Sequence, residues 1–183
     1  MIVLGLDPGS RVCGYAALQI LSPGKQEIIE LGSWEFASKL PFGERLEQLH
    51  DRVAQLVDRL NPRWVGLEMA VAHKNVNSAF KLSEARGVIR LALHQKLAQA
   101  EDRLLEISPT AVKKSATGLG ISDKSQVQKV LRFRFPELQT LATEDNALSH
   151  DAFDALAIAW AALSISQSVQ NPLNSLKETP TEV

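Results

Sequence analysis

The chain contains very little cysteine for its length, and its few histidines form no cluster in the sequence. Among 183 residues there are one cysteine and four histidines. No intramolecular disulfide is therefore possible, and the Cys and His clusters that hold zinc are missing. The lone thiol, Cys13, lies in a strand-like run and is expected to be a small buried hydrophobe. These absences exclude a disulfide-stapled fold, disfavour zinc chemistry and agree with a cytoplasmic location.

Long apolar runs and targeting segments are also absent. No apolar stretch approaches the roughly 20 residues that span a bilayer, and the N-terminus has no basic region followed by a cleavage site. We therefore expect neither a membrane span nor a signal peptide. With 45% hydrophobic residues, the length fits one globular domain, expected over residues 1–165. Ser, Gln, Asn, Pro and Glu dominate residues 166–183, which predicts a disordered tail.

The net charge of −1 hides a basic block in the middle of the chain. Residues 73–134 carry 12 Lys and Arg against 5 Asp and Glu, whereas residues 135–183 carry 1 against 7. Such a block is either a set of solvated helix faces or a contact surface for a phosphate backbone. The pI of about 6.4 argues against a general coat for nucleic acids.

The spacing of apolar residues predicts a three-stranded meander followed by alternating helices and strands. Strands are expected at 2–7, 12–20, 28–36, 63–68 and 103–107, and helices at 46–60, 77–99, 109–117, 123–134 and 150–165. This order predicts an α/β fold, a mixed five-stranded sheet covered by helices. The small residues of the last helix would allow close packing on that sheet.

Four acidic residues lie where a carboxylate needs an explanation. Asp7 and Glu68 each end an apolar strand-like run, where a buried carboxylate is costly unless it is paired. Their strands are expected to be parallel neighbours, so that both acids lie at one edge of the sheet. Asp151 and Asp154 lie three residues apart on one side of the last helix. Two of the acids have an ordinary explanation, a turn for Asp7 and the first turn of a helix for Asp151, whereas Glu68 and Asp154 are less well explained in this way.

A convergence of these four acids would bind divalent cations. Carboxylates are the natural ligands of Mg²⁺, and a pair of such ions cleaves phosphodiesters by activating water and stabilising the leaving oxygen. His150 adjoins Asp151 and could bind a metal or shuttle a proton, although a residue that starts a helix is its ordinary role.

The basic block contains a candidate phosphate site. Lys113 and Lys114 precede a Gly-Leu-Gly turn, and Ser122 or Asp123 can cap the helix that carries Lys124. Free amides at a helix start combined with a lysine bind phosphate, although a plain helix stop and start is the alternative. The polar stretch 73–78 could line a nucleic-acid groove or be a solvated connection.

Six motifs, in their order along the chain, resemble the RuvC-type Holliday junction resolvases. They are Gly5–Val12, Lys74–Leu82, Ala85–Val88, Gly118–Gly120, Lys124–Gln128 and Asp151–Ala157. The resemblance covers about residues 1–165 without a large gap. It implies a ribonuclease-H-like fold with helices on both faces of the sheet. It also implies a homodimer that binds a four-way DNA junction and nicks two opposed strands of like polarity, in homologous recombination and DNA repair.

The resemblance also assigns cofactors, partners and residues. Two Mg²⁺ ions per site are implied, with Mn²⁺ as a substitute, and a RuvA–RuvB branch-migration complex is the implied partner. Basic residues near the scissile phosphate match Lys113 and Lys124. The acids that match the family's metal ligands are Asp7, Glu68, Asp151 and Asp154. Further nucleic-acid contacts are expected from Lys74, Asn75, Lys81, Arg86 and Lys114, with His73 and His150 as accessory residues.

One position departs from the family's pattern. Relatives often carry an aromatic residue three positions after the glutamate, where this chain has Val71. An aromatic would add about 1–3 kcal/mol of stacking per base, which valine cannot supply. We therefore expect altered junction handling or sequence preference, for which His73 or Phe80 could compensate.

Two other functions stay open from the sequence. A junction-binding protein without cutting activity would show the same basic block. The run Gly-Leu-Asp-Pro-Gly-Ser also looks like the first phosphate loop of actin-like ATPases and sugar kinases. Those proteins need two such domains and a second phosphate loop, which is not visible here.

Overall fold

The computed structural model describes residues 1–22, 24–69, 75–141 and 148–170. Its five strands form one sheet in the order β3-β2-β1-β4-β5. The strands are β1 (Ile2–Asp7), β2 (Val12–Ser22), β3 (Lys25–Glu35), β4 (Trp64–Glu68) and β5 (Leu104–Ile107). The β1–β2 and β2–β3 pairs are antiparallel, whereas β1–β4 and β4–β5 are parallel. The predicted mixed five-stranded sheet is confirmed, as is the parallel pairing of the strands that carry Asp7 and Glu68.

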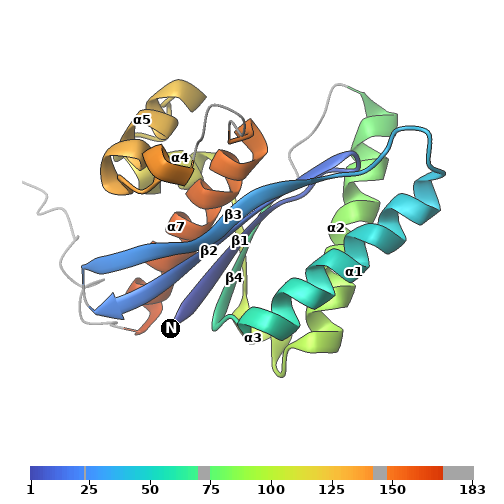
Figure 1. Ribbon diagram of the computed structural model, residues 1–183, viewed down its shortest axis with the longest axis horizontal. Helices are drawn as coiled ribbons and strands as arrows, with labels where there is room; N and C mark the ends of the chain where they lie inside the picture. The colour runs from blue at the N-terminus through green and yellow to red at the C-terminus, as the bar shows by residue number, and fades with distance from the viewer. Residues whose placement is uncertain (23, 70–74, 142–147, 171–183) are drawn as a thin grey trace, which may run out of the picture.

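Helices cover both faces of the sheet (Figure 1). One face is covered by α1 (Phe42–Leu60) and α2 (Val76–Lys96), with the short α3 (Ala100–Arg103) at the end of α2. The other face is covered by α7 (His150–Gln170), against which α4 (Pro109–Thr117) and α5 (Lys124–Arg134) pack. A four-residue helix, α6 (Leu138–Leu141), follows α5. The sheet therefore separates two apolar cores, one on each side.

Strand alternation decides which face the two strand-end acids point to. Leu4 and Leu6 of β1 and Leu67 of β4 belong to the core under α1 and α2. Because successive side chains of a strand point to opposite faces, Asp7 and Glu68 point to the α7 face. Leu6 pairs with Leu67 across the parallel ladder, so the two acids end their strands at the same level.

Glycines allow the backbone of α7 to lie directly on the sheet. A Cβ at Gly5 would collide with the backbone of Ala155 and Ala159, and a Cβ at Gly14 would collide with the carbonyl of Asp151. Gly14 pairs with the acid that ends β1, so the first turn of α7 lies over that strand end. The close packing expected of the alanine-rich helix is confirmed.

Several element boundaries differ from the sequence-based prediction. The long helix predicted over 77–99 ends at Lys96, and the chain reaches α3 through Gln99, whose backbone is left-handed (φ 56°). The short α6 was not predicted, because one helical turn is too short for an apolar period to appear. Cys13 is fully buried, as expected.

The last helix continues past its predicted end. Residues 166–170 are helical, so a tail that begins at 166 is wrong for these five residues. Their serines suggested a loop, but the hydroxyls bond within the helix: Ser166 donates to the carbonyl of Leu163 and Ser168 to that of Ser164. Residues 171–183 lie outside the described residues. Among the described residues, no helix combines the length and apolar character needed to span a bilayer.

Candidate active site

A pocket of about 390 Å³ opens where β1 and β4 end. Three of the four predicted acids line it, namely Asp7, Glu68 and Asp154, together with Lys113 and Lys124. These five side chains come from β1, β4, α7, α4 and α5, respectively. The fold therefore brings together charged groups that are up to 147 positions apart in the sequence (Asp7 and Asp154).

The fourth acid lies beside the pocket and not in its lining. Asp151 is in the first turn of α7, one turn before Asp154, and its carbonyl covers Gly14. Its charge still reaches the pocket, because it contributes to raising the pKa of Asp7. All four acids therefore belong to one electrostatic group.

The pocket holds more negative charge than its lysines neutralise. The pKa of Asp7 is raised from 3.8 to about 8, mainly by burial and then by the charges of Glu68, Asp154 and Asp151. Burial, followed by the charge of Asp154, likewise raises the pKa of Glu68, and Lys124 opposes both shifts. Crowded, partly buried carboxylates of this kind favour the binding of a cation.

One lysine already pairs with an acid of the pocket. The Nζ atom of Lys124 lies 2.5 Å from Oδ2 of Asp154, and this hydrogen bond is the main reason that the pKa of Lys124 is raised. The lysine is positioned by a capping box: Asp123 accepts from the backbone N–H of Gln126, and the Gln126 side chain accepts from that of Asp123. Of the two predicted caps, Asp123 is the one used, while Ser122 bonds within the preceding turn.

The carboxylates of the pocket are suitable ligands for Mg²⁺, although Asp154 is already paired with Lys124. Within the described ranges, no three Asp, Glu, His or Cys side chains are already arranged as a metal site. The candidate ligands are all carboxylates, the oxygen donors that Mg²⁺ prefers. A divalent cation would take over the neutralising role that Lys124 now has for Asp154, and it would lower the raised pKa values of Asp7 and Glu68.

The two neighbouring lysines of α4 face different pockets. Ser108 caps the helix by accepting from the N–H of Ala111, and Gly118 ends it in a left-handed conformation (φ 81°). Lys113 lines the acid pocket, whereas Lys114 lines a separate pocket of about 450 Å³ between α4 and the second half of α7. The structure therefore brings Lys113, but not Lys114, to the candidate site.

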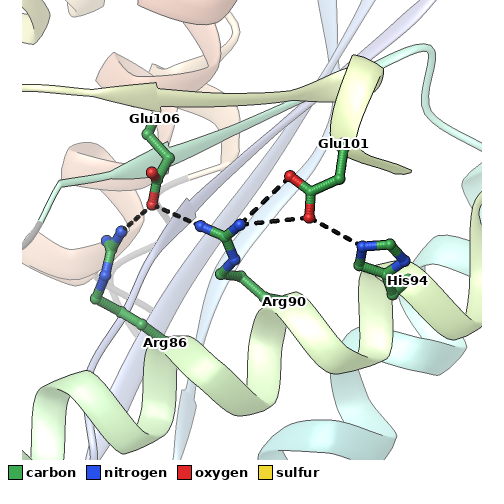
Figure 2. A network of polar contacts seen from close by, with 5 residues as sticks. All are labelled: Arg86, Arg90, His94, Glu101 and Glu106. Atoms are coloured by element: carbon green, nitrogen blue, oxygen red, sulfur yellow. Dashed lines mark hydrogen bonds and ion pairs between the residues drawn. The ribbon is translucent and has the colours of Figure 1, made fainter. Parts of the chain in front are cut away.

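Arg86 is largely buried and forms an ion pair, and it does not line the acid pocket; its expected contact with nucleic acid stays a prediction. Its side chain is 11% exposed, and its Nη2 lies 2.5 Å from Oε1 of Glu106. Figure 2 shows that this contact continues through Arg90 to Glu101 and His94, a network that joins α2, α3 and β5. A basic residue within the basic block is thus used to tie a helix to a strand.

The remaining predicted residues lie outside the pocket lining. Lys81 is exposed, with its Nζ 5.9 Å from the ring centroid of Phe42. Asn75 caps α2 by accepting from the N–H of Ser78. The predicted residues Val71, His73 and Lys74 lie outside the described residues.

His150 is held by a residue that the sequence analysis missed. Its Nδ1 lies 3.0 Å from Nε2 of Gln128, and neither residue lines the acid pocket. Gln128 follows Lys124 by one helical turn, and both side chains reach α7, where Gln128 contacts His150 and Lys124 contacts Asp154. That spacing of four was visible in the sequence, but the partner on α7 was not.

Sequence comparison gives a consistent family. The family model described as "Crossover junction endodeoxyribonuclease RuvC" matches residues 3–162. A curated protein of that name from Treponema denticola is 35% identical over 163 residues, which cover 89% of this chain and 85% of the relative. One from Chloroflexus aggregans is 36% identical over 159 residues, covering 87% and 90%, respectively.

Solved structures share the fold at low sequence identity. "T. thermophilus RuvC in complex with Holliday junction substrate" has a TM-score of 0.79 at 22% identity and covers 92% of this chain and 96% of that one. The yeast mitochondrial Holliday junction resolvase Ydc2 has a TM-score of 0.69 at 16% identity, covering 96% and 83%. The expected ribonuclease-H-like arrangement is confirmed by these matches.

Proposed function

Because this chain belongs to the family of the crossover junction endodeoxyribonuclease RuvC, we propose that it resolves four-way (Holliday) DNA junctions by paired, symmetric nicks. The observation that carries this proposal is the pocket at the strand ends, where three acids and two lysines converge from five separate elements. Binding without cutting would not require this crowded set of carboxylates.

In this proposal the carboxylates hold divalent metal. Asp7, Glu68, Asp151 and Asp154 are the proposed ligands of two Mg²⁺ ions, for which Mn²⁺ can substitute. When bound, these ions supply a nucleophilic water and stabilise the leaving 3′ oxygen. The crowding that raises the pKa of Asp7 to about 8 supports this role, since a bound cation relieves it.

The two lysines of the pocket are proposed to act on the phosphate. Lys113 and Lys124 lie on different helices, α4 and α5, so their ammonium groups can reach a phosphate in the pocket from two elements. When substrate enters, the ammonium group of Lys124 would leave the Asp154 carboxylate and donate to a phosphate oxygen instead. Fixed cations aimed at developing negative charge lower the barrier to phosphoryl transfer.

We also propose that the protein acts as a homodimer, with α2 as the contact helix. Val76, Phe80 and Leu91 are 63%, 63% and 52% exposed on α2, and Gly87 adds a position without a side chain to the same helix. Large exposed apolar residues on one helix favour burial against a second copy. Two copies would present two pockets, one for each nicked strand.

The cellular setting is proposed from family membership alone. We place the protein in the cytoplasm, in homologous recombination and DNA repair, together with a RuvA–RuvB branch-migration complex. Co-purification with those two proteins on a synthetic junction would test the partnership.

One experiment tests the central proposal. The protein is mixed with a labelled four-way junction in Ca²⁺, binding is measured by gel shift, and Mg²⁺ is then added. We expect junction binding in preference to linear duplex, followed by paired nicks at symmetric positions. Binding without nicks would indicate a junction-binding protein, and ATP hydrolysis without DNA would favour the phosphate-loop alternative.

A further inference from the structure

Helix α5 carries basic charge well beyond the acid pocket. Between Lys124 and Arg134 it has four cations and no acid. After Lys124, the exposed residues of its second half are Lys129, Arg132, Phe133 and Arg134, which we call the α5 ridge. Phe133 is 88% exposed, an unusual position for a large aromatic ring.

Two arginines of the ridge are held in place by stacking. The guanidinium of Arg132 lies 4.6 Å from the ring centroid of Phe153, and that of Arg134 lies 4.0 Å from the ring centroid of Trp160. Both rings are fixed on α7, since Phe153 is buried and Trp160 Nε1 donates to the carbonyl of Ser115. Stacking uses the face of a guanidinium but leaves its in-plane N–H donors free for a phosphate.

The cations of the ridge differ from those on the opposite face of the sheet. On α1 and α2, several basic side chains pair with acids, as Arg59 does with Glu30 and Lys96 with Asp58. Among the described residues, none of the three ridge cations has a carboxylate within salt-bridge distance. Their charge is therefore available to an anionic partner.

The ridge begins where the pocket ends. Lys124 lines the pocket, and a helix rises about 1.5 Å per residue, so Arg132 and Arg134 lie about 12–15 Å farther along the axis of α5. One strand of duplex DNA carries a phosphate about every 3.4 Å of axis. A strand that leaves the pocket along α5 would pass the end of the ridge about four nucleotides from the pocket.

We propose that the α5 ridge is a second DNA-contact surface that grips one junction arm about four nucleotides from the cleaved bond. Lys129, Arg132 and Arg134 donate to backbone phosphates, and Phe133 packs against the neighbouring deoxyribose. The proposal rests on the proposed function, because it takes the pocket as the place where the strand is cut. The ridge serves affinity and orientation, not the chemical step.

The test compares affinity and cleavage in the full chain. In the triple variant Lys129→Gln, Arg132→Gln, Arg134→Gln, we expect junction affinity in Ca²⁺ to fall about 10–100-fold. The slope of log K against log[salt], where K is the association constant for the junction, should become shallower by about 2–3. Each phosphate contact contributes about −0.9 to this slope, and the variant loses three such contacts. Single-turnover cleavage at saturating enzyme in Mg²⁺ should stay within about threefold of the parent. Phe133→Ala should weaken binding without changing the slope.

A matched control exists on another part of the molecule. The guanidinium of Arg63 also stacks on a tryptophan, 5.4 Å from the ring centroid of Trp64, but at the opposite end of β4 from Glu68. Arg63→Gln should leave affinity and salt slope unchanged. If the triple variant keeps the parent's salt slope, the ridge proposal is overturned.

A substrate change tests the same contact without altering the protein. Neutral methylphosphonates placed three to five nucleotides from the cleavage site should weaken binding by the parent and leave the triple variant unaffected. Equal effects on both proteins would contradict the ridge. If the parent neither binds nor cuts junctions, the proposed function fails and the ridge proposal with it. If the parent does both while the methylphosphonates have no effect, only the ridge proposal fails.

Discussion

The ammonium of Lys124 and the carboxylate of Asp154 form a direct ion pair, with 2.5 Å between Nζ and Oδ2. The lysine comes from the first turn of α5 and the acid from the first half of α7, so the pair links two helices within the lining of the pocket. This contact neutralises one carboxylate of the pocket with the Lys124 cation. In the proposed function, the binding of metal and phosphate would rearrange the pair.

Removal of this cation should slow cleavage more than it weakens binding. For Lys124→Gln, we expect the single-turnover cleavage rate of a junction in Mg²⁺ to fall about 10²–10³-fold, the loss typical of one charge-stabilising group. Junction affinity in Ca²⁺ should change less than tenfold, because the other basic contacts persist. A variant that cuts at the parent's rate would exclude Lys124 from the chemical step.

The neighbouring lysines of α4 provide a matched pair for the same assay. Lys113→Gln removes a group that lines the acid pocket, and a rate loss similar to that of Lys124→Gln is expected. Lys114→Gln alters the next residue, which lines a different pocket, and it should leave the cleavage rate within about threefold of the parent. Equal losses from both substitutions would show that general basic charge, not position, matters.

The charge crowding around Asp7 should appear as a pH-dependent stability. Its pKa in the folded chain is about 8, above the ordinary value of 3.8, so the folded state binds this proton more tightly than the unfolded state does. The metal-free protein should therefore lose stability as the pH rises from about 4 to 8. Asp7→Asn removes this titration, and at pH 8 the variant should be more stable than the parent by at least about 1 kcal/mol.

Urea denaturation in EDTA at pH 4 and pH 8 checks this expectation. The stability difference between Asp7→Asn and the parent should become much smaller near pH 4, where Asp7 is protonated in the folded parent and only partly ionised in the unfolded chain. The same variant should bind junctions but not cut them. An identical difference at both pH values would contradict the crowding of charge at Asp7.

The close approach of α7 to the sheet predicts a glycine requirement. Gly14→Ala would place a Cβ against the carbonyl of Asp151 and push the first turn of α7 away from Asp7. We expect a loss of about 1–3 kcal/mol of stability, as for an overpacked core, and a loss of Mg²⁺-dependent cleavage in protein that still folds. Calorimetry and the junction assay measure the two effects.

A second glycine serves as its control. A Cβ at Gly43, in the first turn of α1, would meet no atom within 4 Å. Gly43→Ala should therefore leave cleavage unchanged and raise stability slightly, because alanine favours the helix. Similar losses at Gly14 and Gly43 would refute the steric explanation.

The buried arginine should be structural. In Arg86→Gln, the ion pair with Glu106 is lost and a partly buried carboxylate keeps only its contact with Arg90. We expect a loss of about 2–3 kcal/mol of stability, measured by urea denaturation, and an unchanged salt slope of junction binding. If the slope of log K against log[salt] becomes shallower by about 1, Arg86 contacts a backbone phosphate and the structural explanation is wrong.

The features that could be predicted from the sequence are those set by the two-residue period of strands and by the order of the strands along the chain. Asp7 and Glu68 could be assigned to one sheet edge because both end apolar runs, and the alternation of side chains then decides their face. The mixed sheet covered by helices followed from the meander and the alternating elements after it, and the ribonuclease-H-like fold was implied by the family resemblance. The alanine-rich run could be identified as a helix that packs closely on the sheet.

Properties set by tertiary partners could not be predicted. Lys113 and Lys114 are neighbours on one helix, and only the packing of α4 on α7 decides which one faces the acids. Whether the Arg86 side chain is exposed or paired depends on Glu106, which lies 20 residues later on a strand. The continuation of α7 through its serines depends on hydroxyl bonds that composition does not reveal.

The direct seating of α7 on glycine positions has a mechanical consequence. With the backbone of its first turn against Gly14, and its next turns against Gly5, the helix has no side-chain layer on which to slide or tilt at these points. The spacing between the strand acids and the helix acids is therefore as stiff as the core itself. In the proposed function, the bending that brings a scissile phosphate to these acids would then fall on the DNA and not on the helix, which suits a substrate already kinked at its crossover.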